Sequence, residues 1–144
     1  MTIFEFTDYK VFLKHFLKTK KTLGRGTMAR IAEHINVHPT FISQVLSGPK
    51  DFMEEQALPI AEFLGLPPIE QEYFLILVQI ERAGSKQLKN YFRQKRDALR
   101  TESLKIERRV EHQRQLSEEE KSKFYSSWVY SAVHLMTTLE GGSD

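Results

Sequence analysis

Residues 27–50 read TMARIAEHINVHPTFISQVLSGPK, and this stretch predicts two short helices joined by a tight turn. We expect the first helix over about 28–35 and the second over about 39–46. Each carries apolar residues on one face, namely Ile31, Ala32 and Ile35 in the first and Ile42, Val45 and Leu46 in the second. Asn36 tolerates the left-handed conformation that ends a helix, and Gly48 suits the position after the second helix for the same reason.

Two helices joined in this way are typical of a helix-turn-helix, whose second helix enters the major groove of DNA. Ala32 is small where the two helices have to cross closely, and Val37 fills the angle of the turn. The stretch therefore predicts a unit that contacts DNA.

The flanking sequence predicts a core for these two helices. Apolar residues at helical spacing recur on both sides of the stretch, and Thr27 is placed to cap the helix that follows it. The expected helices run from Thr7 or Asp8 to about Thr22, then over about 28–35, 39–46, 53–64 and 68–82. Residues 1–83 are thus expected to form a compact five-helix domain.

The rest of the chain has fewer apolar residues until its last segment. Residues 84–116 predict a long, polar, basic helical linker that is open to a break near 101–103. Ser117 and Glu120 form a capping box that predicts the start of an amphipathic C-terminal helix within 117–144. We expect this helix to dock, to dimerise or to begin a further domain, and the fold class to be all-α.

Composition excludes several classes of protein. The chain of 144 residues has no cysteine, which excludes disulfides and thiol catalysis. No apolar run approaches the roughly 20 residues of a membrane span, and the N-terminal residues lack the order of a signal peptide. We therefore expect a cytoplasmic protein with no membrane partner. The five histidines are scattered and no phosphate-binding glycine loop occurs, so we expect no enzyme activity, metal, cofactor or small-molecule ligand.

Positive charge is concentrated outside the predicted helix-turn-helix. The net charge of the chain is +2, whereas residues 84–114 carry ten basic against four acidic residues, a net of +6. This segment is either a solvated helix face or an arm that contacts the DNA backbone or a second copy. The second helix of the predicted motif has no lysine or arginine, so the commonest specific contact, arginine to guanine, is missing there.

Three phrases follow one another along the chain: IFEFTDYKVFL at 3–13, EQEYFLILV at 70–78 and FYSSWVYSAVHLM at 124–136. With the helix-turn-helix between the first two, the chain resembles a family of predicted bacterial transcriptional regulators. The resemblance implies an N-terminal repressor-like (Xre-type) helix-turn-helix domain and a C-terminal domain of unknown function that begins at the third phrase. Members of that family are about twice as long, so we expect this chain to be a truncated member or a fragment.

Four polar residues on or just before the second helix of the motif are candidates for reading DNA bases. They are His38, Thr40, Ser43 and Gln44. Glutamine can pair with the edge of adenine, and threonine or serine can meet either a base or a thymine methyl group. The alternative for each is an ordinary surface role, and for His38 also a role as a helix cap.

Five further residues are candidates for phosphate contacts. They are Lys21, Arg25, Thr27, Arg30 and Lys50. Thr27 would use its hydroxyl and the amides at the start of its helix, and the others would use their positive charge. The alternative for Thr27 is an ordinary N-cap.

These patterns predict a DNA-binding transcriptional regulator that acts on double-stranded DNA as a homodimer. The alternative is a protein–protein interaction module with the same fold and no sequence-specific DNA binding. The uncharged second helix of the motif and the aromatic C-terminal helix favour that alternative.

Overall fold

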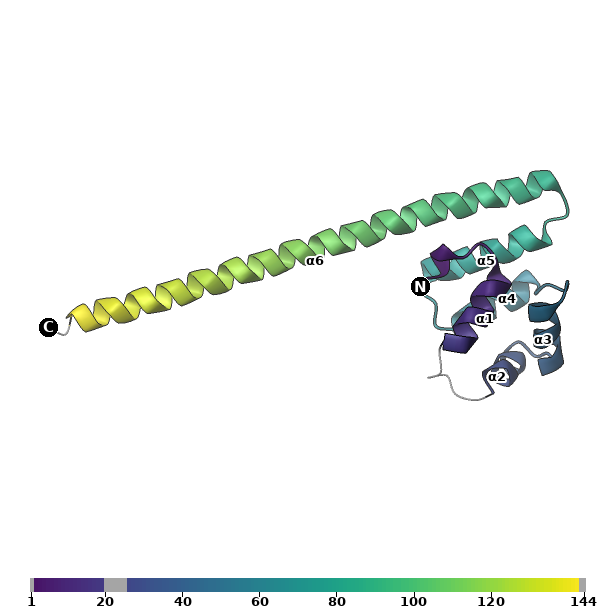
Figure 1. The fold of residues 1–144 in the computed structure, drawn as a ribbon, viewed down its shortest axis with the longest axis horizontal. Helices are drawn as coiled ribbons and strands as arrows, with labels where there is room; N and C mark the ends of the chain where they lie inside the picture. The colour runs from purple at the N-terminus through teal and green to yellow at the C-terminus, as the bar shows by residue number, and fades with distance from the viewer. Residues whose placement is uncertain (1, 20–25, 143–144) are drawn as a thin grey trace. The chain divides into compact units, whose positions relative to one another are not determined.

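The computed structural model describes residues 2–19 and 26–142, with side chains as far as residue 126 and at Trp128. Within these residues the protein is all-α, as predicted. The elements are the short 3-10 helix η1 (Ile3–Glu5) and helices α1 (Tyr9–Thr19), α2 (Thr27–His34), α3 (Pro39–Ser47), α4 (Glu54–Phe63), α5 (Pro68–Arg82) and α6 (Lys86–Gly142). Figure 1 shows their order along the chain.

The chain divides into two compact units between Ser103 and Leu104. Unit 1 is Met1–Ser103 and unit 2 is Leu104–Asp144. The first part of α6 belongs to unit 1 because it packs there. Leu99 is only 7% exposed, and the Arg100 guanidinium donates a hydrogen bond to the Tyr73 hydroxyl at 2.9 Å.

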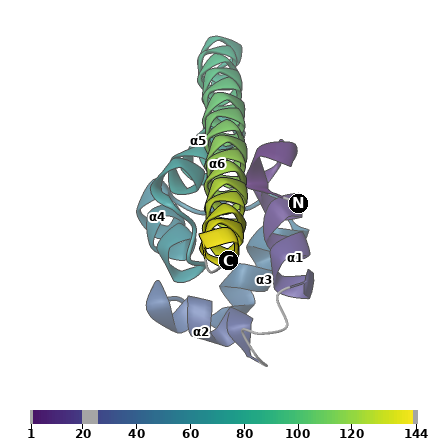
Figure 2. The ribbon, with the colours of Figure 1, turned by 90° about the vertical axis from the view of Figure 1, so that its left-hand side faces the viewer.

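Unit 1 has an apolar core to which each of the helices α1 to α5 contributes. Its largest fully buried side chains include Tyr9, Phe52, Tyr73 and Phe74. Helix α2 packs against α3 and α4, α1 packs against α3 and α5, and α4 packs against α5. In both Figure 1 and Figure 2, α2 and α3 lie on one side of unit 1 and α5 lies on the other.

The apolar faces predicted for α2 and α3 point into this core. Ile31, Ala32, Ile42, Val45 and Leu46 are buried, and Ile35 and Val37 pack half-buried against them. Fully burying a valine, leucine or isoleucine side chain stabilises the fold by roughly 1.5–3 kcal/mol. Burial of one face therefore fixes α3 in unit 1 and leaves its opposite face in solvent.

The turn between α2 and α3 is a Schellman motif centred on Asn36. The main-chain N–H of Asn36 donates to the Glu33 carbonyl at 3.2 Å, and that of Val37 donates to the Ala32 carbonyl at 2.8 Å. Asn36 has a φ of 59°, which confirms the predicted left-handed residue. The reversal ends α2 sharply and sets the start of α3 only a few residues later.

Gly48 follows α3 for a different reason from the predicted one. Its φ of −131° and ψ of −168° are extended backbone, not the left-handed conformation. A Cβ atom at this position would lie 2.8 Å from the main-chain oxygen of Gln44. Glycine is required here because the chain passes close to the last turn of α3.

Helix α2 begins at Thr27, and its N-cap is Gly26, so the prediction that Thr27 caps the helix was wrong. Gly26 has a φ of 77°, and its carbonyl accepts the first hydrogen bond of the helix from the Arg30 N–H at 2.9 Å. Because glycine adopts positive φ without steric cost, the chain can enter the helix one residue earlier than the threonine suggests.

Residues from Lys86 to Gly142 form one continuous helix, so the predicted start of a new helix at Ser117 was wrong, and of the two alternatives for 84–116 the unbroken helix is the one observed. The helix does not break at 101–103 and does not restart at Ser117. No glycine or proline interrupts the sequence before Gly141, and most of the residues are good helix formers. A capping box marks a helix start only where the preceding backbone is non-helical, and here that backbone is already helical.

In unit 2, every described side chain from Leu104 to Ser126 is exposed. The aromatic residues near its end stand out, since Phe124 is 75%, Tyr125 67% and Trp128 61% exposed. The predicted docking of this helix stays a prediction.

Candidate nucleic-acid interface

The solvent-facing side of α3 carries three of the residues predicted to read bases. Thr40, Ser43 and Gln44 are exposed, while the apolar residues on the other side of the helix are buried. The separation follows from the helical period of 3.6 residues, which places positions 40, 43, 44 and 47 on one face. The structure thus brings these polar side chains together in one strip on a fixed helix.

His38 lies at the beginning of this strip as the N-cap of α3. Its Nδ1 atom accepts a hydrogen bond from the main-chain N–H of Thr40 at 3.1 Å. Pro39 occupies the first helical position, where its fixed φ is favourable and its missing N–H has no cost. The capping alternative for His38 is confirmed. Because Nδ1 accepts this hydrogen bond, Nε2 is the ring nitrogen that remains available on the exposed side chain.

Gln44 and Lys50 form a pair at the other end of the strip. The Lys50 ammonium donates a hydrogen bond to Oε1 of Gln44 at 3.0 Å, and both side chains are exposed. Lysine has donors only, so the amide atom facing it has to be the oxygen. The helix itself lacks a cation, but a cation from the following loop lies against its exposed face.

The predicted phosphate-contacting residues are only partly described. Thr27 is half-buried at the start of α2, and Arg30 is exposed on the same helix with its guanidinium 5.6 Å from the centre of the Phe63 ring. Lys50 lies just beyond α3 and is engaged with Gln44. Lys21 and Arg25 lie outside the described residues.

A polar network at the start of α1 holds the segment that follows α3. The Lys10 ammonium donates hydrogen bonds to the carbonyls of Gly48 at 2.8 Å and Lys50 at 2.6 Å, and it lies 3.4 Å from the Asp51 carboxylate. The Lys10 side chain is only 16% exposed. No local pattern predicts these contacts, because the partners are about 40 residues apart in the chain. Covariation of position 10 with position 51 in related sequences could have revealed the ion pair, whereas the contacts with main-chain carbonyls leave no such signal.

Tyr9 completes this network from inside the core. Its hydroxyl donates to Asp51 Oδ1 at 2.7 Å and accepts from the Phe52 N–H at 3.2 Å. Burial, followed by the hydrogen bond to Asp51, raises the pKa of Tyr9 far above its ordinary value of 10.0. The Phe52 ring lies 5.9 Å from that of Phe41 on α3, so the same segment also packs on the helix.

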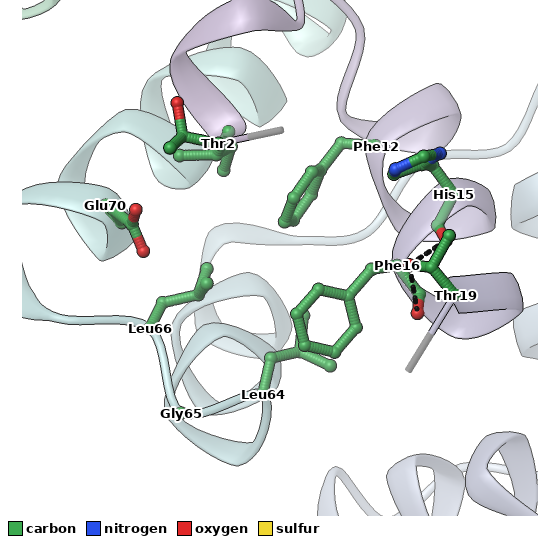
Figure 3. Close-up of a pocket in the computed structure, with 10 residues that line it drawn as sticks. Thr2, Phe12, His15, Phe16, Thr19, Leu64, Gly65, Leu66 and Glu70 are labelled. Carbon is green, nitrogen blue, oxygen red and sulfur yellow. Dashed lines mark hydrogen bonds between the residues drawn. The ribbon is translucent and has the colours of Figure 1, made fainter. Parts of the chain in front are cut away.

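A cavity of about 610 Å³ lies elsewhere in unit 1, between α1, the start of the chain and the α4–α5 connection. Figure 3 shows the Phe12 and Phe16 rings at this cavity, with the Glu70 carboxylate and the His15 ring on opposite sides. The Thr19 hydroxyl donates to the His15 carbonyl at 2.9 Å. None of the residues predicted to contact DNA lines this cavity.

Two findings bear on other functions. Among the described residues, no group of three or more histidine, aspartate or glutamate side chains could hold a metal ion. No helix in the described part of the chain is both long enough and apolar enough to cross a membrane.

Comparisons of the chain with family models, with curated proteins and with solved structures gave no match.

Proposed function

We propose that this protein is a DNA-binding transcriptional regulator in which α3 reads duplex DNA in the major groove. The exposed strip of Thr40, Ser43 and Gln44, on a helix fixed by its buried opposite face, carries the proposal. In this proposal α2, the Asn36 turn and α3 are the helix-turn-helix of a repressor-like domain formed by α1 to α5. The major groove admits an α-helix, and hydroxyl and amide side chains that face out of it can reach base edges.

Phosphate contacts around α3 would position the protein on DNA. Thr27 and Arg30 lie on α2, the neighbour of α3, and we assign them to the backbone together with Lys21 and Arg25. The net charge of +6 over residues 84–114 supports an additional non-specific attraction to DNA. Each neutralised phosphate contributes to affinity and makes it sensitive to salt.

We further propose that the protein acts as a homodimer. A single short recognition helix without arginine or lysine offers few specific contacts, and a second copy doubles their number. Helix-turn-helix dimers read two half-sites about one turn of DNA apart, so a dimer predicts an inverted repeat in the target.

A double variant tests the role of α3. Thr40→Ala with Gln44→Ala should lower the affinity for a selected target duplex about tenfold or more, because two base contacts are lost in each copy. Affinity for mixed genomic duplexes should persist and should fall with added salt. Fluorescence anisotropy on labelled duplexes measures both affinities.

A matched control removes the same residue types from α6. Gln94 and Thr101 are exposed there, and Gln94→Ala with Thr101→Ala should leave binding to the target unchanged. If the α3 double variant bound its target as tightly as this control, the assignment of α3 as the reading helix would be wrong.

A protein–protein interaction module is the second candidate. The exposed aromatic side chains Phe124, Tyr125 and Trp128 favour it, because large aromatic residues are typical of protein interfaces. No measurable affinity of the full chain for mixed genomic duplexes at low salt would favour this candidate over DNA binding.

A further inference from the structure

The pairing of Gln44 with Lys50 changes what the exposed face of α3 offers to a base. A free glutamine amide reads adenine because its Oε1 accepts from the N6 amino group while its Nε2 donates to N7. Here Oε1 already accepts from the Lys50 ammonium at 3.0 Å. An adenine amino group would have to approach this oxygen beside the Lys50 ammonium. Both groups are hydrogen-bond donors, and the ammonium carries a positive charge, so this approach is unfavourable.

The Gln44 Oε1 atom keeps one lone pair, but that lone pair lies beside the ammonium, and the other polar atoms that the pair presents are donors. The Nε2 amino group of Gln44 keeps its protons, and the Lys50 ammonium has further protons besides the one given to Gln44. Guanine has two acceptors, N7 and O6, side by side in the major groove, and lysine is among the residues that bind them. A donor pair with positive charge is therefore complementary to guanine rather than to adenine.

The main chain of Lys50 is held in place, so only its side chain has to be ordered. Its carbonyl accepts from the Lys10 ammonium at 2.6 Å, and the same ammonium binds the Gly48 carbonyl at 2.8 Å. Asp51, the next residue, lies 3.4 Å from Lys10 and accepts from Tyr9 at 2.7 Å. This network links the root of the Lys50 side chain to α1, which is itself anchored in the core.

We infer that Lys50 and Gln44 act together as a donor pair that recognises a guanine edge, with Lys10 as the residue that positions Lys50. The inference rests on the proposed function, and it assigns Lys50 to a base rather than to a flanking phosphate. It also gives a source for the positive charge that α3 itself lacks.

Substitution of Lys50 tests the inference on duplexes that differ at one base pair. Lys50→Met removes the ammonium and keeps an apolar stem of similar length. The wild-type chain of 144 residues should prefer guanine over adenine at one position of each half-site by about tenfold, the scale of one good bidentate contact. Lys50→Met should abolish this preference or reverse it toward adenine, because the Gln44 amide is released.

Three further variants control for charge and for position. Lys123→Met removes an equal charge from an exposed position of α6 and should keep the guanine preference. Lys10→Met should reduce the preference for guanine over adenine at the same base pair only, and it should leave the dependence of affinity on salt concentration unchanged. Lys10→Arg should restore the preference. Circular dichroism of each variant shows whether it is folded.

The outcomes separate the inference from the proposed function. A wild-type preference for adenine at every position, or an unchanged guanine preference in Lys50→Met, would overturn the inference alone. A uniform loss of affinity in Lys50→Met, with a salt slope lower by about one, would assign Lys50 to a phosphate and also overturn it. Failure of the wild-type chain to bind any duplex would overturn both.

Discussion

Helix α3 and the part of α6 beyond Ser103 both carry large apolar side chains, but these side chains lie in opposite surroundings. Ile42 on α3 is 1% exposed, whereas Ile106 on α6 is 41% exposed. Val45 and Leu46 of α3 also lie in the core of unit 1 and Phe41 packs half-buried against it, whereas the large apolar residues described in unit 2 are exposed. The sequence pattern of both segments is helical, so the difference comes from tertiary packing.

This difference has a consequence for function. A helix fixed by its buried face can hold polar side chains in a defined arrangement, which specific recognition requires. Helix α3 meets this condition through its core face and the Lys10 network at its end. The distal part of α6 has no such support among the described residues of its own unit, and its apolar surface is exposed.

The largest expected difference in stability is between two isoleucine substitutions, one on α3 and one on the distal part of α6. Ile42→Ala should lower the free energy of unfolding by about 3 kcal/mol, because it leaves a cavity in a closely packed core. Ile106→Ala should change it by less than about 0.5 kcal/mol, as expected for an exposed position. Urea denaturation followed by circular dichroism measures both. An equal loss for Ile106→Ala would show that its face is covered in solution.

The two tyrosines give the next contrast. Tyr9→Phe should cost about 2 kcal/mol, because the buried Phe52 N–H loses its acceptor and Asp51 loses a donor. Tyr125→Phe, at a 67% exposed position, should have no measurable effect. Chemical denaturation at neutral pH tests the pair, and similar losses for both would contradict the contrast.

The raised pKa of Tyr9 adds a dependence on pH to the same variant. Above about pH 10 an unfolded tyrosine ionises, while the buried Tyr9 keeps its proton. The folded state then binds more protons than the unfolded state, so stability falls as pH rises through this range. Wild type should lose stability between about pH 9 and 11 more steeply than Tyr9→Phe. Equal slopes for the two proteins would contradict this assignment.

Substitution of Gly48 tests whether the chain passes close to the last turn of α3. Gly48→Ala should cost about 1–2 kcal/mol, because the new Cβ would meet the Gln44 carbonyl at 2.8 Å and the main chain has to shift. At Gly84 a Cβ would meet nothing within 4 Å, so Gly84→Ala should be neutral or slightly stabilising. Thermal denaturation compares the two, and a neutral Gly48→Ala would contradict the close approach.

The smallest expected effect is at the turn between α2 and α3. Asn36→Ala should cost about 1 kcal/mol, because alanine tolerates the left-handed conformation poorly. Asn36→Gly should be neutral or better, since glycine adopts positive φ without steric cost. If alanine were tolerated as well as glycine in urea denaturation, the Schellman turn would not be what ends α2.

Much of unit 1 could be predicted from the sequence, because its signals are local. The spacing of Ile31, Ile42 and Val45 predicts the buried faces, and Asn36 predicts the left-handed turn. The end of unit 1 could not be predicted in this way. Leu99 and Arg100 read as part of an exposed linker until their contacts with the domain are known.

The candidate site was predictable only in part for the same physical reason. The exposed positions Thr40, Ser43 and Gln44 follow from the helical period. The Lys10 network depends on contacts between distant parts of the chain, and the hydrogen bond from Lys50 to Gln44 depends on the path of the loop at Gly48. Such contacts leave no mark in local sequence spacing.

Selection of bound sequences from random duplexes, with the molar mass measured in solution, tests the central claim most directly. We predict that the wild-type chain of 144 residues enriches an inverted repeat with half-sites about one helical turn apart. We also predict a molar mass in solution of twice the 16.9 kDa of one chain. A selected pool with no sequence enriched above the starting library would contradict the claim that α3 reads DNA.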